Sequence, residues 1–353
     1  MRTVAGEGDP PGAHRRRTAP GGPGGNRSRI VSTTSLVDSY DTVLFDLDGV
    51  IYRGPRALPN VPEVLAEIED RGIHCVYVTN NASRTAETVA GHLRDLGIPC
   101  AEEQVVTSPQ AAAEILRGIC PQSAHVFVVG GEGVEHALRG AGFTPTRNPD
   151  HQPVAVVQGF APDVGWRDLA AASYLIESGC LWIATNLDLT FPTEFGIAPG
   201  NGSLVAAVAN ATGRQPDHVA GKPEPALLLT AMNRVGASRA LMVGDRLDTD
   251  IAGAERAGID SLYVATGVHS VADVFGAPSG MRPTFLGPDL RVLLQPAPTP
   301  DGQRAWDVAT SLAEECWRAR GALTAIDVGE VVAGWSTRFP DALPRPAIST
   351  VGH

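Results

Sequence analysis

Short apolar runs alternate along this chain with longer segments whose apolar residues recur at helical spacing. Residues 43–45, 75–78 and 241–243 each form a run with the length of a buried strand. Between the first two runs, apolar residues recur on one face of a predicted helix that ends at Gly72. Strands that alternate with helices are typical of a parallel sheet, so the pattern predicts an α/β fold with a Rossmann-like core.

The alternation starts afresh in the middle of the chain. Three further apolar runs predict strands at 126–129, 154–157 and 181–184. A complete α/β unit placed inside another domain indicates two lobes. We therefore expect a core domain at 37–108 and 220–294, with an inserted α/β cap domain at 109–219.

The two ends of the chain differ from this pattern. Residues 1–36 are rich in Pro, Gly, Ser and Arg and hold little to bury, so we expect a disordered arm. After Leu294 comes a proline-rich joint, and residues 301–353 form a short C-terminal extension with three tryptophans. About fifty residues are marginal as an independent domain, so we expect this extension to dock on the core or on a second subunit.

Polar residues follow the predicted strands at the points where they end. Asp46 and Asp48 come after the first run, and Gly49 lets the chain turn away. Asp and Gly also favour ordinary turns, and the rest of the chain decides between the two interpretations. A right-handed crossover places the polar residues after the second strand at the same edge of the sheet. These residues are Thr79, Asn80 and Asn81.

The third predicted strand ends in the sequence GDRLDTD, which supplies Asp245, Asp248 and Asp250. Like charges that gather at a strand end are costly unless a cation compensates them. Carboxylate oxygens without nearby His or Cys suit Mg²⁺. Lys222, which lies between a glycine and a proline ahead of a predicted helix, is a second candidate source of positive charge.

A long polar and glycine-rich loop spans residues 185–203 of the predicted cap. It is too long to be a simple connection in a compact domain, and loops of this kind often bind ligands. Contact with substrate and a structural role are equally consistent with its polar residues, and Ser203 is also a candidate helix cap. The candidates are Asn186, Asp188, Gly200, Asn201 and Ser203.

Composition narrows the classes of function. The formal net charge of −11 argues against nucleic acid as a partner, because phosphate backbones are bound by patches of Lys and Arg. No stretch reaches the apolar length needed to cross a bilayer. The five cysteines are scattered, with no CxxC pair, as is typical of reduced cytosolic thiols. We therefore expect a cytoplasmic protein that acts on neither nucleic acid nor membrane.

Together these residues can hydrolyse a phosphomonoester. Asp46 would attack phosphorus and form an aspartyl-phosphate that water later hydrolyses. Asp48 would give a proton to the leaving alcohol and later take one from water. Mg²⁺ and Lys222 would cancel the repulsion between carboxylate and phosphate, and Thr79 with Asn80 would hold the phosphate oxygens. We expect Mg²⁺ to be held by Asp46, Asp245 and a main-chain carbonyl near Asp48.

The motifs FDLDG, VTNN, GKP and GDRLDTD, in this order, resemble the four motifs of the haloacid dehalogenase (HAD) superfamily of phosphatases. The resemblance covers about residues 37–294, and the lobe between the second and third motifs is similar to the cap of the class IIA branch. It implies the HAD fold, with Asp46 as nucleophile and Asp48 as acid/base and carbonyl ligand of the metal. It also implies phosphate binding by Thr79 and Lys222 and metal ligation by Asp245. For Asp250 it implies either an outer position around the metal or the orientation of Lys222.

The predicted cap bears on the substrate. A large cap that closes over the crevice excludes phosphoproteins and favours small phosphorylated metabolites. The polar cap loop has few aromatic residues, which suits a hydroxylated aliphatic leaving group, so we expect glycerol 3-phosphate. Phosphoglycolate, pyridoxal phosphate and nucleoside monophosphates stay open, as do a homodimer and substrate contacts by Gly49 and Asn81.

Two other classes of function compete with a phosphatase. A phosphotransferase or mutase could use the same aspartyl-phosphate chemistry, but it would need an acceptor sugar and usually a different cap. A catalytically silent regulatory or binding protein could keep the fold without turnover. The presence of Asp46, Asp48, Lys222 and Asp245 together argues against it, since the loss of any one would be its simplest sign. We therefore expect a phosphoric monoester hydrolase.

Overall fold

The computed structural model describes residues 35–193, 195–270, 273–274, 277–287 and 289–295. The predicted C-terminal extension lies outside these residues, as does nearly all of the predicted N-terminal arm. The last two residues assigned to that arm, Ser35 and Leu36, are buried instead. Ser35 Oγ donates to the carbonyl oxygen of Leu294 at 3.0 Å, so these residues pack with the end of the described chain.

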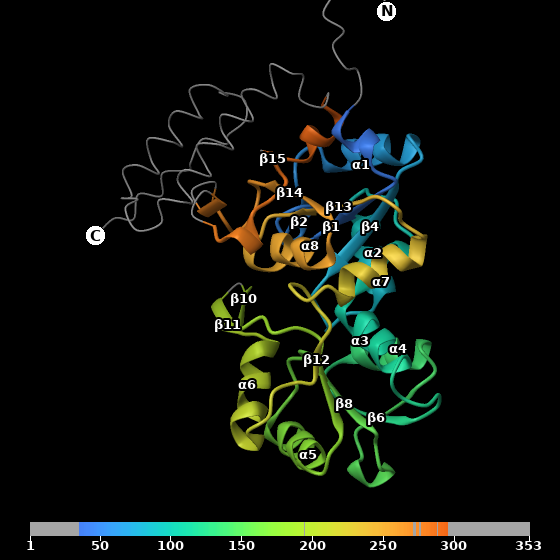
Figure 1. Cartoon of the computed structure of the whole chain (residues 1–353), viewed down its shortest axis with the longest axis vertical. Coiled ribbons are helices and arrows are strands. Elements are labelled where there is room, and N and C mark those ends of the chain that lie inside the picture. The colour runs from blue at the N-terminus through green and yellow to red at the C-terminus, as the bar shows by residue number, and fades with distance from the viewer. Residues whose placement is uncertain (1–34, 194, 271–272, 275–276, 288, 296–353) are drawn as a thin grey trace, which may run out of the picture. The chain divides into compact units, whose positions relative to one another are not determined.

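Six strands form the first sheet, in the order β15-β14-β13-β1-β4-β5, and every pairing in it is parallel. Strand β1 lies between β13 and β4 (Figure 1), so the residues after these three strands emerge side by side at one edge of the sheet. The strands are β1 (Thr42–Phe45), β4 (His74–Thr79), β5 (Val105–Thr107), β13 (Ala240–Gly244), β14 (Asp260–Val264) and β15 (Phe285–Gly287).

Side chains of this sheet alternate between two layers of helices. Phe45 packs with α1 and α2, whereas Leu44 lies on the opposite face with α3, α7 and α8. Burial on both faces explains why the strands appear in the sequence as continuous apolar runs. The helices are α1 (Val61–Asp70), α2 (Ala86–Asp95), α3 (Ser108–Arg117), α7 (Ala226–Val235) and α8 (Ala252–Ala257).

The chain between α3 and α7 forms a second parallel sheet, in the order β12-β9-β8-β6-β7. Helices α5 and α6 pack on one face of this sheet, and α4 packs on the other. Helix α3 contacts both α4 and α7, so the cap boundary predicted at residue 109 falls inside a helix that touches both lobes. The elements are β6 (His125–Val129), α4 (Glu132–Gly140), β7 (Thr144–Thr146), β8 (Ala155–Gln158), α5 (Trp166–Glu177), β9 (Leu181–Ala184), α6 (Asn201–Thr212) and β12 (His218–Val219).

Short elements complete the described chain. The antiparallel pair β2 and β3 follows the turn at Gly49. A π-helix, η4, joins β13 to α8. The elements are η1 (Leu36–Ser39), β2 (Tyr52–Arg53), β3 (Arg56–Ala57), η2 (Glu102–Gln104), η3 (Pro149–His151), η4 (Leu247–Ile251), η5 (Ser279–Met281) and η6 (Leu290–Leu294).

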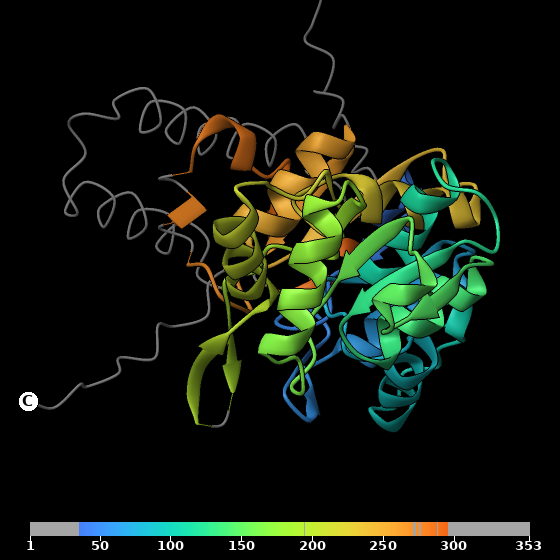
Figure 2. The same cartoon turned by 90° about the horizontal axis from the view of Figure 1, so that it is seen from below.

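The predicted loop at 185–203 is more regular than expected. It contains the antiparallel hairpin β10 (Thr190–Thr193) and β11 (Gly196–Pro199), which extends as a two-stranded arm (Figure 2). Prolines and a glycine within the two strands hide the strand pattern in the sequence. Helix α6 begins at Asn201, so Ser203 lies inside the helix and does not cap it. The first sheet also continues past β13 to β14 and β15.

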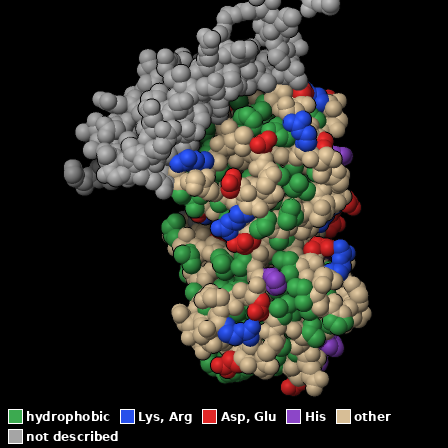
Figure 3. Space-filling model, viewed as in Figure 1, with side chains coloured by type: hydrophobic (Ala, Val, Ile, Leu, Met, Phe, Trp, Pro, Cys, Tyr) green, Lys and Arg blue, Asp and Glu red, His purple; other side chains and the backbone are tan. Residues whose placement is uncertain are grey.

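No helix among the described residues is long and apolar enough to cross a membrane. On the face drawn in Figure 3, acidic and basic side chains are interspersed. Mixed charge of this kind is typical of a hydrated protein surface.

Candidate active site

The ends of β1, β4 and β13 bring the predicted core residues together. Phe45 pairs with Tyr77 of β4 and with Val243 of β13, so Asp46 lies between the residues that follow these strands. Asp46 N donates to the carbonyl oxygen of Val243 at 3.0 Å and continues the sheet by one residue. The prediction that Thr79 and Asp46 share one edge of the sheet is therefore confirmed.

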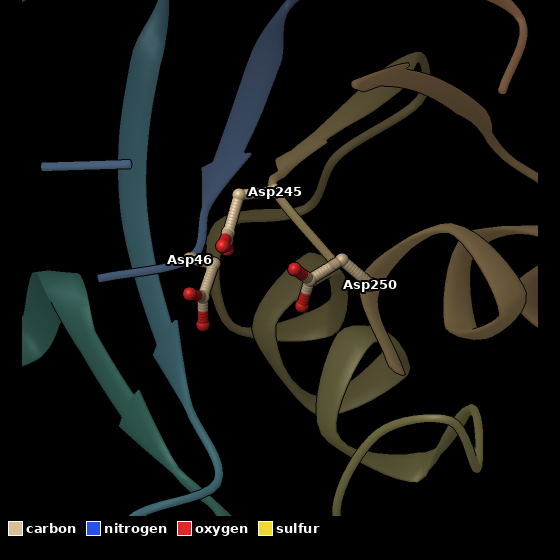
Figure 4. A group of neighbouring side chains, drawn as sticks. All are labelled: Asp46, Asp245 and Asp250. Carbon is tan, nitrogen blue, oxygen red and sulfur yellow. The ribbon is translucent and has the colours of Figure 1, made fainter. Parts of the chain in front are cut away.

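Three carboxylates gather at this edge (Figure 4). Asp46, Asp245 and Asp250 each place an oxygen within 4.8 Å of the other two. Asp245 and Asp250 are buried, whereas the Asp46 side chain is 14% exposed. The two Asp245 oxygens differ. Oδ2 accepts a hydrogen bond from Val268 N at 2.6 Å, whereas Oδ1 is buried and has no hydrogen-bond partner among the described residues.

Lys222 supplies positive charge to this cluster. Its Nζ lies 2.5 Å from Asp46 Oδ1 and 2.8 Å from Asp250 Oδ1, and the side chain is 2% exposed. Burial would lower the pKa of Lys222, but the carboxylates of Asp250 and Asp46 outweigh burial and raise it above its ordinary value. Lys222 is therefore charged. It is also the only lysine in the sequence, where the other permanently charged basic side chains are arginines.

The cluster sets three carboxyl groups against one ammonium. Burial raises the pKa of Asp46 against the opposing effect of Lys222, and the neighbouring carboxylates of Asp250 and Asp245 raise it further. Burial and the Asp250 carboxylate raise the pKa of Asp245 to about 7. A divalent cation fits this arrangement, because it would offset the excess negative charge and bind the unpartnered oxygen of Asp245.

Two glycines allow the chain to wrap closely around Asp245. Gly49 has a φ of +89°, and a Cβ at this position would lie 2.6 Å from Asp245 Oδ2. A Cβ at Gly267 would lie 1.7 Å from the same oxygen. A side chain at either position would therefore displace the carboxylate. Thr266 joins the two loops, since its Oγ1 donates to the carbonyl oxygen of Gly49 at 2.5 Å.

The loop Thr266–Val268 is the part of this site that the sequence analysis missed. It follows β14, the neighbour of β13 in the sheet, and the main-chain N–H of Val268 binds Asp245. Its residues also follow the end of a parallel strand, so their place in the sequence is a signal that could have found them. Gly267 follows an apolar run in the sequence just as Gly49 does.

Asp48, two residues after Asp46, is exposed. Its side chain reaches solvent, but the surrounding protein still raises its pKa through partial burial, which outweighs the opposing effects of Arg84, His92 and Lys222. A raised pKa suits a group that must hold a proton and then release it. The roles of Asp48 as acid/base and as a carbonyl ligand of a metal stay predictions.

The polar residues after β4 have different partners. Thr79 is buried, and its Oγ1 accepts a hydrogen bond from Asn81 N at 3.1 Å. Asn81 Oδ1 accepts hydrogen bonds from both N and Oγ of Ser83. Asn80 Oδ1 accepts from Lys222 N at 2.8 Å. Phosphate binding by Thr79 and Asn80 and substrate contact by Asn81 stay predictions, and the structure adds a contact of Asn80 with the main chain of Lys222.

Two predicted substrate-binding residues of the cap are buried and bound to main-chain oxygens. Asn186 Nδ2 donates to the carbonyl oxygen of Asn80 at 2.7 Å. Asn201 Nδ2 donates to the carbonyl oxygen of Asn186 at 2.8 Å, while its Oδ1 has no hydrogen-bond partner within the part of the chain that the structure describes. These contacts favour a structural role for both residues, an alternative that the sequence left open.

Asp188 is the cap carboxylate that contacts the core. Its Oδ2 accepts a hydrogen bond from Asn80 Nδ2 at 3.1 Å. Gly200 and Ser203 act within the cap loop: a Cβ at Gly200 would meet the Asp188 carbonyl oxygen at 2.2 Å, and Ser203 Oγ donates to the carbonyl oxygen of Leu189 at 2.7 Å. Among the loop candidates, Asn186 and Asp188 therefore both reach Asn80 of the core, Asn186 at its main-chain oxygen and Asp188 at its side chain.

Comparisons with known proteins agree with this arrangement. Residues 43–144 match the family of haloacid dehalogenase-like hydrolases, and residues 219–293 match the HAD-hydrolase-like family. D-glycerol 3-phosphate phosphatase from Mycobacterium tuberculosis is 46% identical over 261 residues, which cover 74% of this chain and 73% of that protein. Acid sugar phosphatase from Staphylococcus aureus is 36% identical over 253 residues, which cover 71% of this chain and 95% of that protein.

The crystal structure of glycerol phosphate phosphatase from Mycobacterium tuberculosis in complex with magnesium is similar in fold. The match has a TM-score of 0.72 and 45% identity, and it covers 76% of this chain and 82% of that chain. The fold, the carboxylates at the strand ends and these relatives define a phosphatase, a phosphoric monoester hydrolase built on a parallel α/β sheet. The chain belongs to the haloacid dehalogenase-like hydrolases, in their branch with a class IIA cap.

Proposed function

We propose that this chain is a Mg²⁺-dependent phosphatase that hydrolyses small phosphomonoesters through an aspartyl-phosphate, with glycerol 3-phosphate as its best substrate. The observation that carries the proposal is the buried cluster of Asp46, Asp245, Asp250 and Lys222. Within the described residues, Asp245 Oδ1 has no hydrogen-bond partner, which suits an oxygen that binds a cation.

Asp46 is the nucleophile of the proposed reaction. Lys222 contacts its Oδ1 at 2.5 Å and so orients the carboxylate. As an Asp46 oxygen bonds to phosphorus, the ester P–O bond breaks, and Asp48 donates its proton to the departing alkoxide oxygen. Asp48 then takes a proton from the water that attacks the aspartyl-phosphate, which releases inorganic phosphate and restores Asp46.

Asp46, Asp245 and the main-chain carbonyl of Asp48 would hold Mg²⁺. When bound, the cation supplies the charge that offsets repulsion between the nucleophile and the phosphate. Asp250 contacts Lys222 Nζ at 2.8 Å, so of the two roles that the resemblance allowed, we assign it the orientation of the ammonium. Thr79 and Lys222 would bind the phosphate oxygens.

The choice of glycerol 3-phosphate is supported by the relatives. D-glycerol 3-phosphate phosphatase is 46% identical to this chain. Acid sugar phosphatase, at 36% identity, also argues for a small hydroxylated leaving group. Phosphoglycolate, pyridoxal phosphate and nucleoside monophosphates are the alternatives that belong in the same assay.

The test is phosphate release from a panel of these esters and of sugar phosphates, with Mg²⁺ and with a chelator. We expect release only with Mg²⁺ and fastest from glycerol 3-phosphate. Asp46→Asn should lower the rate by at least about 10⁴-fold, because the amide cannot act as the nucleophile. Another ester ranking first would correct the substrate alone. Equal rates with the chelator, or an active Asp46→Asn variant, would refute the mechanism.

The remaining predictions complete the proposal. We assign residues 37–108 and 220–294 to the core and 109–219 to the cap, with α3 in contact with elements of both. A homodimer and a cytoplasmic location stay predictions, which sedimentation of the purified chain and fractionation of its host cells would test.

A further inference from the structure

Asn80 holds the main chain of Lys222 with both ends of its amide. Its Oδ1 accepts a hydrogen bond from Lys222 N at 2.8 Å, and its Nδ2 donates to Lys222 O at 2.9 Å. The same Nδ2 donates to Asp188 Oδ2 at 3.1 Å. The Asn80 nitrogen thus faces two acceptors and the Asn80 oxygen faces one donor. These partners determine which end of the amide is the nitrogen.

The surroundings of Asn80 bring three parts of the chain together. Its main-chain oxygen accepts hydrogen bonds from Asn186 Nδ2 at 2.7 Å and from Ser108 Oγ, at the start of α3, at 2.8 Å. A Cβ at Gly221 would lie 2.6 Å from Asn80 Oδ1, so the glycine lets the Lys222 loop approach the amide closely. The end of β4, the loop before α7 and the cap loop therefore meet at one side chain.

Asp188 also lies near a second loop of the core. Its Oδ1 is 3.9 Å from Arg246 Nη1. The main-chain N–H of Arg246 donates to Asp250 Oδ2 at 3.1 Å, and Asp250 Oδ1 contacts Lys222. The cap carboxylate is thus connected to Lys222 by two routes. One runs through Asn80 to the Lys222 main chain, and the other through Arg246 and Asp250 to the ammonium.

We propose that Asn80 is a positioning residue that couples the cap to Lys222. Its contact with Asp188 holds the amide in the orientation that forms hydrogen bonds with the Lys222 main chain. These hydrogen bonds place the Lys222 ammonium beside Asp46. The inference rests on the proposed phosphatase activity and adds to it, because it gives the cap a part in organising the core site. Direct binding of phosphate by the Asn80 side chain is the competing account.

The experiment compares Asn80→Asp with the exchanged pair Asn80→Asp/Asp188→Asn. Asn80→Asp keeps an acceptor for Lys222 N but faces two acceptors, Asp188 Oδ2 and Lys222 O, without a donor. We expect kcat/KM for the best ester of the panel to fall about 30-fold. The exchanged pair restores a donor and an acceptor between the two positions and should recover about fivefold or more of that loss.

The matched control is Asn210→Asp, which makes the same change at an exposed position of α6 and should keep the native rate. An Asn80→Asp rate equal to that of this control would overturn the proposal. A double variant no faster than Asn80→Asp would do the same and would support direct phosphate binding, because a lost phosphate contact is not restored from the cap.

Amide hydrogen exchange over residues 221–224 provides a readout that needs no turnover. We expect faster exchange in Asn80→Asp, because repulsion from Asp188 Oδ2 and Lys222 O would displace the new carboxylate from Lys222 N. The exchanged pair should return toward the native rate. A native chain that releases no phosphate would refute the proposed function, whereas this exchange pattern would still test the coupling.

If Asn80→Asp does not fold, the cap side gives the same test. Asp188→Asn keeps an acceptor for Asn80 Nδ2, and Asp188→Ala removes it. We expect faster exchange over residues 221–224 in the alanine variant than in the asparagine variant. Equal exchange in these two variants would overturn the proposal.

Discussion

The core strand ends and the cap loop both bury polar residues, but the two groups bond differently. In the core, Lys222 Nζ contacts the carboxylates of both Asp46 and Asp250. In the cap, Asn186 and Asn201 are neutral, and their amide nitrogens bind main-chain oxygens. The core group sets three carboxyl groups against one ammonium, whereas the cap amides bind the main chain.

This difference separates chemistry from architecture. A buried charge cluster is costly unless it is paired or binds a cation, so its presence at the strand ends points to a reaction or a ligand. The amide nitrogens of the two cap asparagines satisfy main-chain carbonyls, which removes a cost of folding. Polar residue type alone does not distinguish the two cases, but hydrogen-bond partners do.

The largest expected effect follows from removing the single ammonium of the core cluster. Lys222→Met would leave the carboxylates of Asp46 and Asp250 without their cation. We expect phosphate release to fall by about 10³-fold or more and the free energy of unfolding to fall by about 3 kcal/mol. Phosphate assays and urea titration measure the two effects.

Lys222→Arg is the control for this prediction. It keeps the charge, but a planar guanidinium does not fit a slot that holds a compact ammonium between two carboxylates. We expect it to recover stability more than rate. If Lys222→Met released phosphate within tenfold of the native rate, the core cluster would have a structural role and not a catalytic one.

The affinity for Mg²⁺ should depend on pH through Asp245. Its pKa of about 7 means that the metal-free carboxyl is protonated below that pH and ionised above it. Because binding requires the ionised form, we expect the affinity to fall about tenfold for each pH unit below about 7. Isothermal calorimetry at pH 5, 6, 7 and 8 measures this dependence.

The same shift bears on stability without metal. The pKa of Asp245 is raised on folding, so the folded state holds a proton that the unfolded state has lost between about pH 4 and pH 7. The metal-free protein should therefore lose stability as pH rises through this window, and Mg²⁺ should stabilise it more at pH 8 than at pH 5. Equal Mg²⁺ affinity at pH 5 and pH 8 would contradict both expectations.

A smaller effect is expected from Gly49→Ala. The added Cβ would lie 2.6 Å from Asp245 Oδ2, and the residue has a φ of +89°. We expect about tenfold slower phosphate release and a loss of about 2 kcal/mol in the free energy of unfolding. Gly54→Ala is the control, because Gly54 has a φ of +57° with nothing within 4 Å of the Cβ position. It should lose about 1 kcal/mol with the rate unchanged.

The smallest effect on the reaction is expected in the cap. Asn201→Ala removes the donor to the carbonyl oxygen of Asn186 and should cost about 1–3 kcal/mol of unfolding free energy. The KM for each ester of the panel should stay within about twofold, because the Asn201 amide nitrogen binds the main chain of the loop. A change of KM for one ester alone, with the free energy of unfolding unchanged, would indicate that Asn201 binds substrate.

The positions of the core site residues could be predicted because they follow from local patterns and one rule of topology. Apolar runs identified β1, β4 and β13, and the carboxyl ends of neighbouring parallel strands meet at one edge. That rule brought Asp46, Thr79 and Asp245 together without knowledge of any side-chain contact. Applied to β14 as well, the same rule would have placed Gly267 at this edge.

Other features could not be predicted in this way. The hairpin β10–β11 was missed because its prolines and glycine weaken the strand pattern. The structural roles of Asn186 and Asn201 depend on main-chain oxygens that other parts of the chain present. In the sequence, these two asparagines look like any other polar loop residues.

The amino-acid sequence by itself determined the alternation of strands and helices and the acidic and basic groups at the strand ends, since both are local. The tertiary structure alone decided that Asn80 grips Lys222, 142 positions away, and that Asp188 of the cap reaches the same amide. The physical reason is that a hydrogen bond depends on distances of about 3 Å between atoms. Periodicity predicts which strand a residue follows, but only the packed chain brings two such atoms together.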